Sequence, residues 1–345
     1  MKRLGGCLLL VLLLAQTAWA HLDVHFLDVG QGDSIFIITS QEQTMLIDGG
    51  PEDAGWEVVV PYLEDLGVEG LDVVVATHPH ADHIGGLLAV LESFPVERVI
   101  ADGQLHTTRT YERFLTAVLE KDIPFHTPKR GESIALAGVD EIRVLHPGED
   151  FLQGLNNNSV VLRLVYKDVA FLFPGDLEAP GEEVLLASGL PLGAQVLKVA
   201  HHGSKTSSTL GFLQAASPRI GVIQVGADNV YGLPDEQTLE NLEALGTTVL
   251  RTDEKGRILI RTDGRDWQGF LGPPLDLNEA NLGEIQALPG IGPVLAQRII
   301  AYREKGPFRS IDELTRIWGI GPARLAELRG LITVKEVEAG CVSVP

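Results

Sequence analysis

Four side chains that commonly bind metal ions fall within six positions of this sequence: His78, His80, Asp82 and His83. Imidazole and carboxylate groups together suit zinc, manganese or iron. The spacing H-x-H-x-D-H allows two ions, with the first two histidines on one ion and Asp82 and His83 on the other. A solvated loop whose histidines only bond to the backbone has no need of so many ligand-type residues, so we interpret the cluster as metal-binding.

The segments on either side of this cluster predict how it is held. The apolar run 71–76 before it predicts a buried strand, and Gly85-Gly86 followed by the apolar run 87–91 predicts the start of a helix. The cluster is therefore expected on a loop at the carboxyl end of a strand. Proteins of the α/β class usually carry their chemistry at such strand ends.

Three further stretches combine polar residues with an adjacent apolar strand. Asp176 follows one such strand, the pair His201-His202 follows another, and 156–159 (Asn-Asn-Asn-Ser) precedes a third. A histidine pair on a glycine-containing loop favours a functional site. Two alternatives stay open, because Asp176 can cap the next helix and the asparagines can form an ordinary turn.

The body of the chain alternates between strand-like and helix-like patterns. Strands that meet at hairpins, followed by strand–helix alternation, predict two mixed sheets sandwiched between helices, hence an α/β protein. The strands are expected at 24–27, 35–39, 45–50, 71–76, 96–101, 142–145, 159–165, 170–173, 195–199, 220–225, 247–250 and 257–260, and the helices at 54–66, 111–120, 179–188 and 236–245.

The first twenty residues predict a signal peptide rather than part of the fold. Lys2 and Arg3 precede the apolar run 4–14, and Ala18-Trp19-Ala20 forms a small-x-small cleavage site before His21. An uncleaved N-terminal anchor is the alternative. The mature protein is therefore expected to be exported, in the periplasm or outside the cell, without an integral membrane segment.

Charge is distributed unevenly along the 345 residues. The whole chain has a net charge of −20, which argues against nonspecific adhesion to nucleic acid or to an anionic membrane. Residues 275–335 nevertheless contain eight Lys and Arg against seven Asp and Glu, a net charge of +1. Two domains with different electrostatic roles are the simplest interpretation.

A short glycine motif occurs twice after the predicted linker Pro273-Pro274. Leu-Pro-Gly-Ile-Gly-Pro at 288–293 recurs as Ile-Trp-Gly-Ile-Gly-Pro at 317–322, each between two short amphipathic helices. Glycines let a phosphate approach the backbone, and a helix N-terminus offers it free N–H groups. A helical protein-interaction module is the alternative. The candidate phosphate-binding residues are Gly290, Ile291, Gly292, Gly319, Ile320, Gly321, Arg298 and Arg324, while the side chains of Ile291, Ile320, Trp318 and Phe308 are expected in the core.

The loop at 77–86 resembles the signature of the metallo-β-lactamase superfamily, whose members are mostly binuclear hydrolases. Further segments at 26–34, 46–50, 157–159, 174–178, 198–204 and 229–232 resemble, in order and spacing, the metallo-β-lactamase domain of ComEC-type competence proteins. This resemblance covers about residues 22–263. It implies an αββα sandwich and a phosphodiesterase or DNase site with two divalent metal ions, zinc by preference and manganese as the alternative.

The resemblance also implies roles for single residues. Asp176 is expected to bridge the two metals, and His202 to complete the second site, with His201 near the reacting phosphate. Asp82, Asn158 and Lys205 are the other candidates for catalysis or phosphate binding, and Asp48, Thr77 and Asp28 are expected to orient the ligands.

The sequence departs from the family pattern at three positions. His80 stands where the competence proteins often carry aspartate, which gives this chain a fuller ligand set. Asn158 lies near the place of an isolated third histidine, and Leu233 replaces a histidine. The absence of the third histidine is expected to leave the first metal under-coordinated or open, and Leu233 removes a histidine that would contact substrate or bind metal.

The C-terminal repeat resembles the tandem helix-hairpin-helix domain of ComEA-type DNA receptors. The predicted organisation is a signal peptide at 1–20, a hydrolase domain at 21–270 and an all-α helix-hairpin-helix domain at 275–335. The predicted function is cleavage of DNA in competence-like uptake, with the tethered module raising the local DNA concentration. The alternatives are a small-substrate phosphodiesterase or esterase and a catalytically weak DNA receptor. The oligomeric state stays open.

Overall fold

The structure, a computed structural model of the chain, describes residues 21–335. The expected signal peptide lies outside the described residues, as does the segment 336–345. Within the described range, no helix combines the length and apolar character needed to cross a bilayer.

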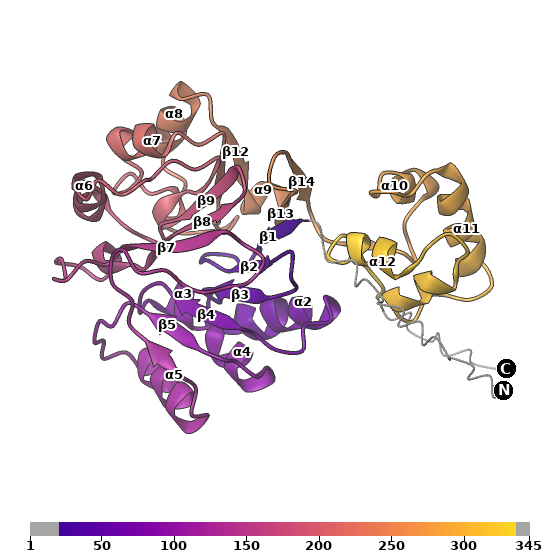
Figure 1. Cartoon of the computed structure of the whole chain (residues 1–345), viewed down its shortest axis with the longest axis horizontal. Helices are drawn as coiled ribbons and strands as arrows, with labels where there is room; N and C mark the ends of the chain where they lie inside the picture. The colour runs from indigo at the N-terminus through magenta and orange to yellow at the C-terminus, as the bar shows by residue number, and fades with distance from the viewer. Residues whose placement is uncertain (1–20, 336–345) are drawn as a thin grey trace, which may run out of the picture.

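Two β-sheets lie face to face in the larger part of the molecule (Figure 1). The first has the strand order β14 (Trp267–Leu271), β13 (Ile258–Thr262), β1 (Leu22–Phe26), β2 (Ile35–Ile38), β3 (Thr44–Ile47), β4 (Val73–Ala76), β5 (Val99–Ala101) and β6 (Phe125–His126). The second has the order β12 (Thr248–Arg251), β11 (Ile220–Ile223), β10 (Val196–Lys198), β9 (Val169–Phe173), β8 (Val161–Tyr166) and β7 (Glu141–His146). Each sheet mixes parallel and antiparallel pairs, as expected.

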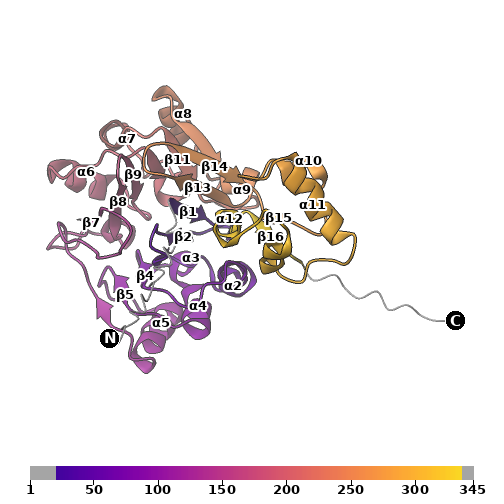
Figure 2. The same cartoon turned by 45° about the vertical axis from the view of Figure 1, so that its right-hand side comes forward.

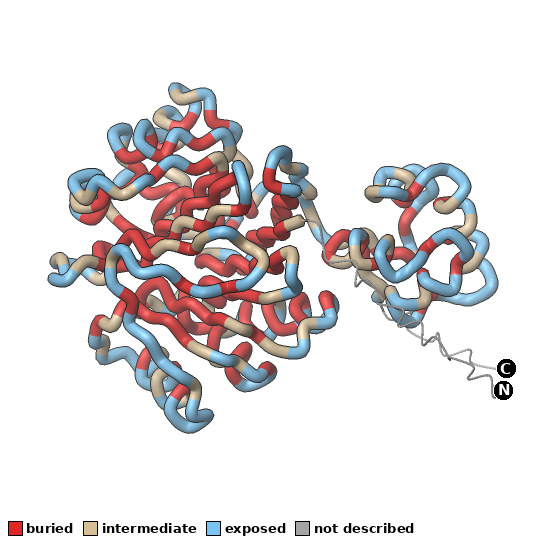
Figure 3. Tube along the Cα trace, viewed as in Figure 1, coloured by how far each residue is buried: buried red, intermediate tan, exposed pale blue. Residues whose placement is uncertain are grey.

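Helices cover the outer face of each sheet. The first sheet is covered by α1 (Glu52–Ala54), α2 (Val60–Asp65), α4 (Leu87–Ser93) and α5 (Arg109–Glu120), and the second by α6 (Ala179–Ala187), α7 (Leu210–Ala216) and α8 (Glu236–Ala244). Apolar side chains form one core between the sheets and another beneath each helical layer. The strands between these layers are therefore largely buried (Figure 3). The predicted αββα sandwich is confirmed.

The segment 54–66 is not the single helix that its apolar spacing predicts. It consists of α1, a π-helical turn η1 (Gly55–Val59) and α2. Pro61, in the first turn of α2, has no N–H to donate to the carbonyl four residues earlier, which accounts for a break in the regular ladder.

The predicted metal-binding loop is partly helical. His80 has extended backbone angles, and Asp82 and His83 lie on the one-turn helix α3 (Ala81–Ile84) directly after it. The amide of His83 donates to the His80 carbonyl over 3.1 Å. This turn sets the direction of the last two candidate ligands.

The C-terminal part of the described chain is a helical module closed by a small sheet. The strand β15 (Leu275–Asp276) pairs in parallel with β16 (Ile332–Thr333), which the purely helical expectation missed. Between them lie α10 (Leu282–Gln286), α11 (Pro293–Arg303), the 3-10 helix η4 (Ile311–Arg316) and α12 (Pro322–Leu328).

This module is docked on the hydrolase part rather than loosely tethered. Leu259 of β13 is fully buried in the apolar core of the module, together with Leu277 and Ile332. Arg257 and Arg261 of the same strand donate to the carbonyls of Gly330 and Glu327 over 2.9 and 2.6 Å. Figures 1 and 2 both show the module beside β13 and β14.

Candidate metal centre

The candidate ligands follow four strands of the two facing sheets. Asp48 follows β3, the cluster 78–83 follows β4, Asp176 follows β9, and the pair 201–202 follows β10 within the short helix η3 (Ala200–Gly203). Strand β3 is parallel to β4, and β9 is parallel to β10. Their carboxyl ends therefore meet, and the structure brings the predicted histidines and aspartates together.

The first group of converging atoms comes from the H-x-H part of the loop. The Nε2 atom of His78 lies 2.9 Å from Nδ1 of His80 and 4.0 Å from Oδ2 of Asp176. On its other side, Nδ1 of His78 lies 3.1 Å from the Thr77 hydroxyl, which donates to Asp48 over 2.6 Å. Thr77 thus lies where it can orient the imidazole.

The second group lies beside the first and shares Asp176 with it. Oδ2 of Asp176 is 3.2 Å from Nε2 of His83 and 3.4 Å from Nε2 of His202. Oδ2 of Asp82 is 3.4 Å from the same His202 atom. Asp176 therefore lies between the two groups.

Both buried histidines of the second group are held by their outer nitrogens. Nδ1 of His83 lies 2.9 Å from Asp48, and Nδ1 of His202 lies 2.9 Å from the backbone carbonyl of Gln224. A hydrogen bond from Nδ1 fixes the tautomer that leaves Nε2 free toward the centre.

The donor set fits divalent metal ions. Overlapping trios of His and Asp atoms lie within 4.8 Å of one another, among them His78–His83–Asp176 and Asp82–His83–His202. Among the described residues, neither Nε2 of His202 nor Oδ1 of Asp176 has a hydrogen-bond partner, although both are buried. Buried polar atoms without a partner are costly, and coordination of a cation would satisfy them.

Charge coupling within the centre supports the same interpretation. Burial opposes the charged form of His83, yet Asp176, Asp82 and Asp48 raise its pKa well above the usual value. Burial likewise opposes ionisation of Asp176, but His83 and His202 hold its pKa well below the usual range. Protons on the histidines thus balance the buried carboxylates, and a divalent metal would replace those protons.

Two charged residues of the centre were missed by the sequence interpretation. Lys198, fully buried, forms an ion pair with Oδ2 of Asp33 and lies 3.7 Å from Oδ1 of Asp176. Oδ1 of Asp33 is 3.3 Å from Nδ1 of His202. A lysine inside an otherwise apolar strand was the available signal, because it needs a buried carboxylate partner.

Asp28 does not orient the ligands, contrary to expectation. It is exposed, and its carboxylate accepts from the amide of Gly30 over 3.4 Å. Gly30 and Gly32 have φ values of +71° and +147°, which turn the loop so that Asp33 instead faces inward.

Asn158 does not offer its amide to a substrate, which is a second correction. Its Oδ1 accepts from Leu152 over 2.7 Å, and its amide nitrogen donates to Gln104, Leu152 and Gly154. The side chain thereby closes the loop 152–158. Asn156 reaches the centre instead, with Nδ2 3.4 Å from Nε2 of His201.

Lys205 lies outside the centre. Its side chain is 70% exposed, and Nζ is 3.6 Å from Asp235 rather than near a candidate ligand. His201 is at the edge of the centre, with Nε2 3.8 Å from Oδ2 of Asp176 and Nδ1 3.1 Å from the Thr206 hydroxyl. His201 and His202 both adopt left-handed φ values, 50° and 52°, a strained conformation typical of functional sites.

The helix-hairpin-helix residues divide into buried and exposed groups. Ile291 and Ile320 are buried in the module core, so their side chains are not available to DNA. Phe308 is buried as expected, whereas Trp318 is 81% exposed, contrary to expectation. The hairpin glycines remain the places where a backbone phosphate can approach.

The two arginines expected to bind DNA are both bonded to the second hairpin. Arg298 donates to the carbonyl of Trp318 over 2.7 Å, and Arg324 donates to that of Gly319. Both positively charged side chains are half-buried beside the hairpin.

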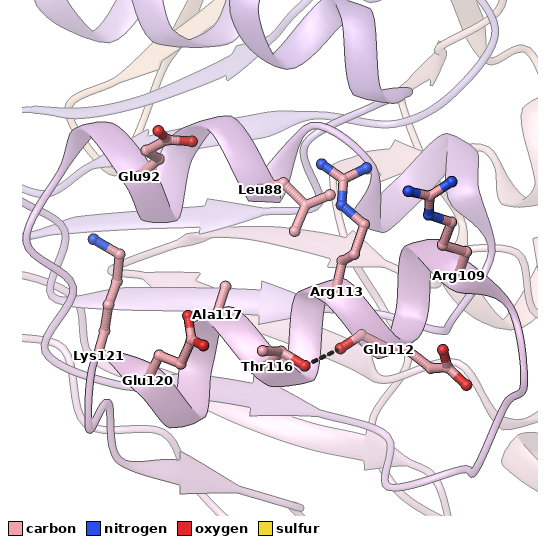
Figure 4. Close-up of a pocket in the computed structure, with 9 residues that line it drawn as sticks. All are labelled: Leu88, Glu92, Arg109, Glu112, Arg113, Thr116, Ala117, Glu120 and Lys121. Carbon is pink, nitrogen blue, oxygen red and sulfur yellow. Dashed lines mark hydrogen bonds between the residues drawn. The ribbon is translucent and has the colours of Figure 1, made fainter.

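A groove of about 530 Å³ lies elsewhere, between α4 and α5 (Figure 4). Its lining includes Leu88, Glu92, Arg113 and Lys121 and none of the candidate metal ligands. Arg113 is paired with Glu52 over 2.7 Å. This groove is therefore not part of the centre.

Fold and ligand arrangement are those of a metallo-hydrolase fold, and the chain belongs to the metallo-beta-lactamase superfamily, whose family model matches residues 27–226. A helix-hairpin-helix motif model matches residues 272–333. The family implies divalent metal ions, and the ligand groups described above are candidates to hold them.

The relatives of the chain include competence proteins. It is 31% identical to ComE operon protein 3 of Bacillus subtilis over 74% of this chain and 35% of the relative. It is 34% identical to competence protein ComA of Neisseria gonorrhoeae over 67% of this chain and 31% of that protein. ComE operon protein 1 of Bacillus subtilis is 41% identical over 68 residues, 19% of this chain and 33% of the relative. The chain thus spans about a third of the length of these relatives.

Proposed function

We propose that this chain is an exported, binuclear metal-dependent phosphodiesterase of the nuclease type that acts on DNA held by its own helix-hairpin-helix module. The observation that carries the proposal is the convergence of six His and Asp side chains at the carboxyl ends of facing strands, in a chain that also carries a DNA-binding module. Competence relatives support a place for it in DNA uptake, and the N-terminal signal pattern supports export.

The proposed ligands form two sets that share one residue. His78 and His80 would hold the first ion, and Asp82, His83 and His202 the second, with Asp176 between them. When bound, two divalent ions (zinc by the donor set, or manganese) lower the pKa of water to about 7 and neutralise charge on the phosphate.

The remaining residues would hold the ligands and orient the substrate. Asp48 and the Gln224 carbonyl keep Nε2 of His83 and His202 directed inward. His201 and Asn156 lie side by side at the edge of the centre, where both can hydrogen-bond to phosphate oxygens. Thr206 fixes the imidazole of His201 from behind.

A cleavage assay tests the proposal. The chain from His21 is incubated with plasmid and single-stranded DNA, with added Zn²⁺ or Mn²⁺ and with EDTA. We expect metal-dependent cleavage that His80→Ala and Asp176→Ala abolish, together with a lower metal content measured by elemental analysis. His126→Ala is the matched control, because this histidine is exposed and pairs with Glu132 away from the centre.

Intact DNA with every metal, in a folded and metal-loaded protein, would refute the nuclease assignment. Cleavage of chromogenic phosphodiesters alone would then indicate a small-substrate phosphodiesterase. DNA binding that survives EDTA, without any hydrolysis, would indicate a receptor with a structural metal fold.

A further inference from the structure

Trp318 is exposed at the tip of the second hairpin. Its relative exposure of 81% is unusual for a large aromatic side chain, since tryptophan is highly buried on average. The neighbouring hairpin residue Ile320 is buried in the module core, so the hairpin itself is well packed. The tryptophan therefore adds little to the core of the module.

Arg298 holds this indole in a defined orientation. Its guanidinium lies 4.5 Å from the ring centroid, and its Nη1 donates to the Trp318 carbonyl over 2.7 Å. The guanidinium thus stacks on the Trp318 ring, while most of the indole surface faces solvent. A flat aromatic surface held in this way is suited to stacking a second planar group.

The first hairpin shows that the tryptophan is not needed for the hairpin fold. Pro289 stands at the position that Trp318 occupies in the second copy, and both are followed by Gly-Ile-Gly-Pro. The two hairpins lie close together, since a Cβ on Gly319 would be 2.8 Å from the side chain of Leu295 at the start of α11. The aromatic side chain therefore gives the second hairpin a property that the first lacks.

We propose that Trp318, oriented by Arg298, stacks an unpaired nucleobase, so that the module binds single-stranded DNA as well as a phosphate backbone. This inference rests on the proposed DNA-binding function. In a duplex the faces of the bases are covered by their neighbours, whereas every base of a single strand offers a face to an aromatic ring. The guanidinium of Arg298 lies beside the ring, where it can also attract the adjoining phosphate.

The surroundings of Trp318 favour nucleic acid over protein or lipid. Arg298 of α11 stacks on the ring, and Arg324 of α12 donates to the carbonyl of the next residue, Gly319. An arginine interleaved with an aromatic ring is typical of single-strand binding. Within the described part of the module, Leu282 and Val294 are the other exposed large apolar residues, at 39% and 60%. Three exposed large apolar residues in the module are few for the broad patch that anchors a protein partner.

Binding titrations in EDTA, which prevents cleavage, test the proposal on the full chain. The probes are a labelled oligothymidine strand and the duplex that it forms with its complement. We expect Trp318→Ala to weaken single-strand binding by roughly tenfold, the equivalent of one lost base stack, and to change duplex binding by less than about twofold. Trp318→Phe should retain most of the affinity, and Leu282→Ala, another exposed apolar residue of the module, is the matched control.

Equal losses for both probes, or no loss for either, would overturn the stacking assignment while leaving DNA binding intact. Failure of the unmutated chain to bind either probe would overturn the DNA-binding function and this inference together. Binding to vesicles of anionic lipid that depends on Trp318, with unchanged single-strand affinity, would assign the indole to a membrane surface instead. Far-ultraviolet circular dichroism and the melting temperature of Trp318→Ala should match the unmutated chain, since the ring is exposed and adds little to the core.

Discussion

At the residue scale, the ammonium group of Lys198 shows how the centre tolerates several buried carboxylates. Burial disfavours its charged form, yet Asp33 and Asp176 raise its pKa above the usual value. The lysine remains charged and links the two carboxylates behind His202. Because a buried ion pair is expensive to desolvate, its presence at a ligand site indicates that it fixes geometry more than it adds stability.

Replacement of Lys198 by methionine should therefore be strongly destabilising. The substitution keeps the approximate volume but removes the lysine charge that faces Asp33 and Asp176, and breaking such a buried pair costs about 3–5 kcal/mol. Urea unfolding in EDTA measures the change, and Lys205→Met is the control because the Lys205 side chain is 70% exposed. The control should change the free energy of unfolding by less than about 0.5 kcal/mol. Similar free energies of unfolding for the two variants would show that the charge of Lys198 is not needed to stabilise the buried carboxylates.

Asp102, in the loop after β5, should make stability fall with rising pH. Burial raises its pKa to about 7, against hydrogen bonds from Gln104 that lower it. Since the folded state binds the proton more tightly than the unfolded state, this contribution is fully present below the unfolded pKa of 3.8 and is lost as the pH passes the folded value. Between pH 5 and 8 the loss amounts to roughly 2.5 kcal/mol.

Asp102→Asn should remove this pH dependence. The free energy of unfolding of each protein is measured in EDTA at pH 5 and at pH 8. The change between these pH values is then compared for the two proteins, which cancels any cost of the substitution that does not depend on pH. A variant whose stability declines with pH as steeply as that of the unmutated chain would show that another group titrates.

Site residues close together in sequence were easier to predict than those on isolated loops. The cluster 78–83 follows one strand, so its position required only a correct strand end. The motifs placed Asp28, Asn158 and Lys205 in the correct loops. They did not predict the direction in which each side chain points. Backbone turns at Gly30 and Gly32 and hydrogen bonds within 152–158 set those directions, and neither is visible in residue types.

At the element scale, a close contact between backbones positions the metal-binding turn. The amide of Gly86, which precedes α4, donates to the Gly50 carbonyl over 2.8 Å, and a Cβ there would overlap the carbonyl oxygen of Gly49. Gly49 in turn donates to the His83 carbonyl over 2.7 Å. The glycines after the Asp-His pair thus let this turn pack against the end of β3.

Gly86→Ala should consequently destabilise the fold and weaken metal binding. The added methyl group has no space, and overpacking of this kind costs about 1–3 kcal/mol. Gly193→Ala is the matched control, because a Cβ at Gly193 meets no atom within 4 Å. Denaturant unfolding and zinc titration measure the two effects. If Gly86→Ala kept its full affinity for zinc, the close packing of this turn would not be needed to position the metal ligands.

The sequence patterns predicted most of the long elements but few of the short ones. Strands such as β4 and β9 are continuous apolar runs that remain recognisable without any context. The break at η1 and the two-residue strands β15 and β16 carry no periodic signal of their own. Those strands form only because the ends of the C-terminal module meet in space, which is a tertiary effect.

At the scale of the whole molecule, the position of the DNA-binding module relative to the metal centre is fixed by buried contacts. The guanidinium of Arg261 makes a bidentate pair with Asp23 of β1, at 2.7 and 2.6 Å, and also donates to the Glu327 carbonyl of the module. Asp23 and Arg261 are both buried. A docked module would present DNA to the acidic hydrolase body in one orientation, which local concentration alone does not provide.

Arg261→Met should separate the two parts of the chain and destabilise the hydrolase part. Loss of the guanidinium removes the bond to Glu327 and leaves the buried Asp23 without its arginine partner, at a cost of about 3–5 kcal/mol. The double variant Arg261→Met/Asp23→Asn removes the carboxylate charge and should recover much of that stability without restoring the bond to the module. Arg265→Met, at an exposed position of the β13–β14 turn, is the control.

Small-angle scattering and limited proteolysis between β14 and β15 distinguish docked from undocked states. We expect a larger radius of gyration and faster cleavage near Pro273 in the double variant, with the control unchanged. Because the metal ligands are untouched, hydrolysis of a small phosphodiester should persist in the double variant while its action on DNA declines. A double variant that stays compact and retains its rate on DNA would show that the apolar contacts around Leu259 suffice to hold the module in place.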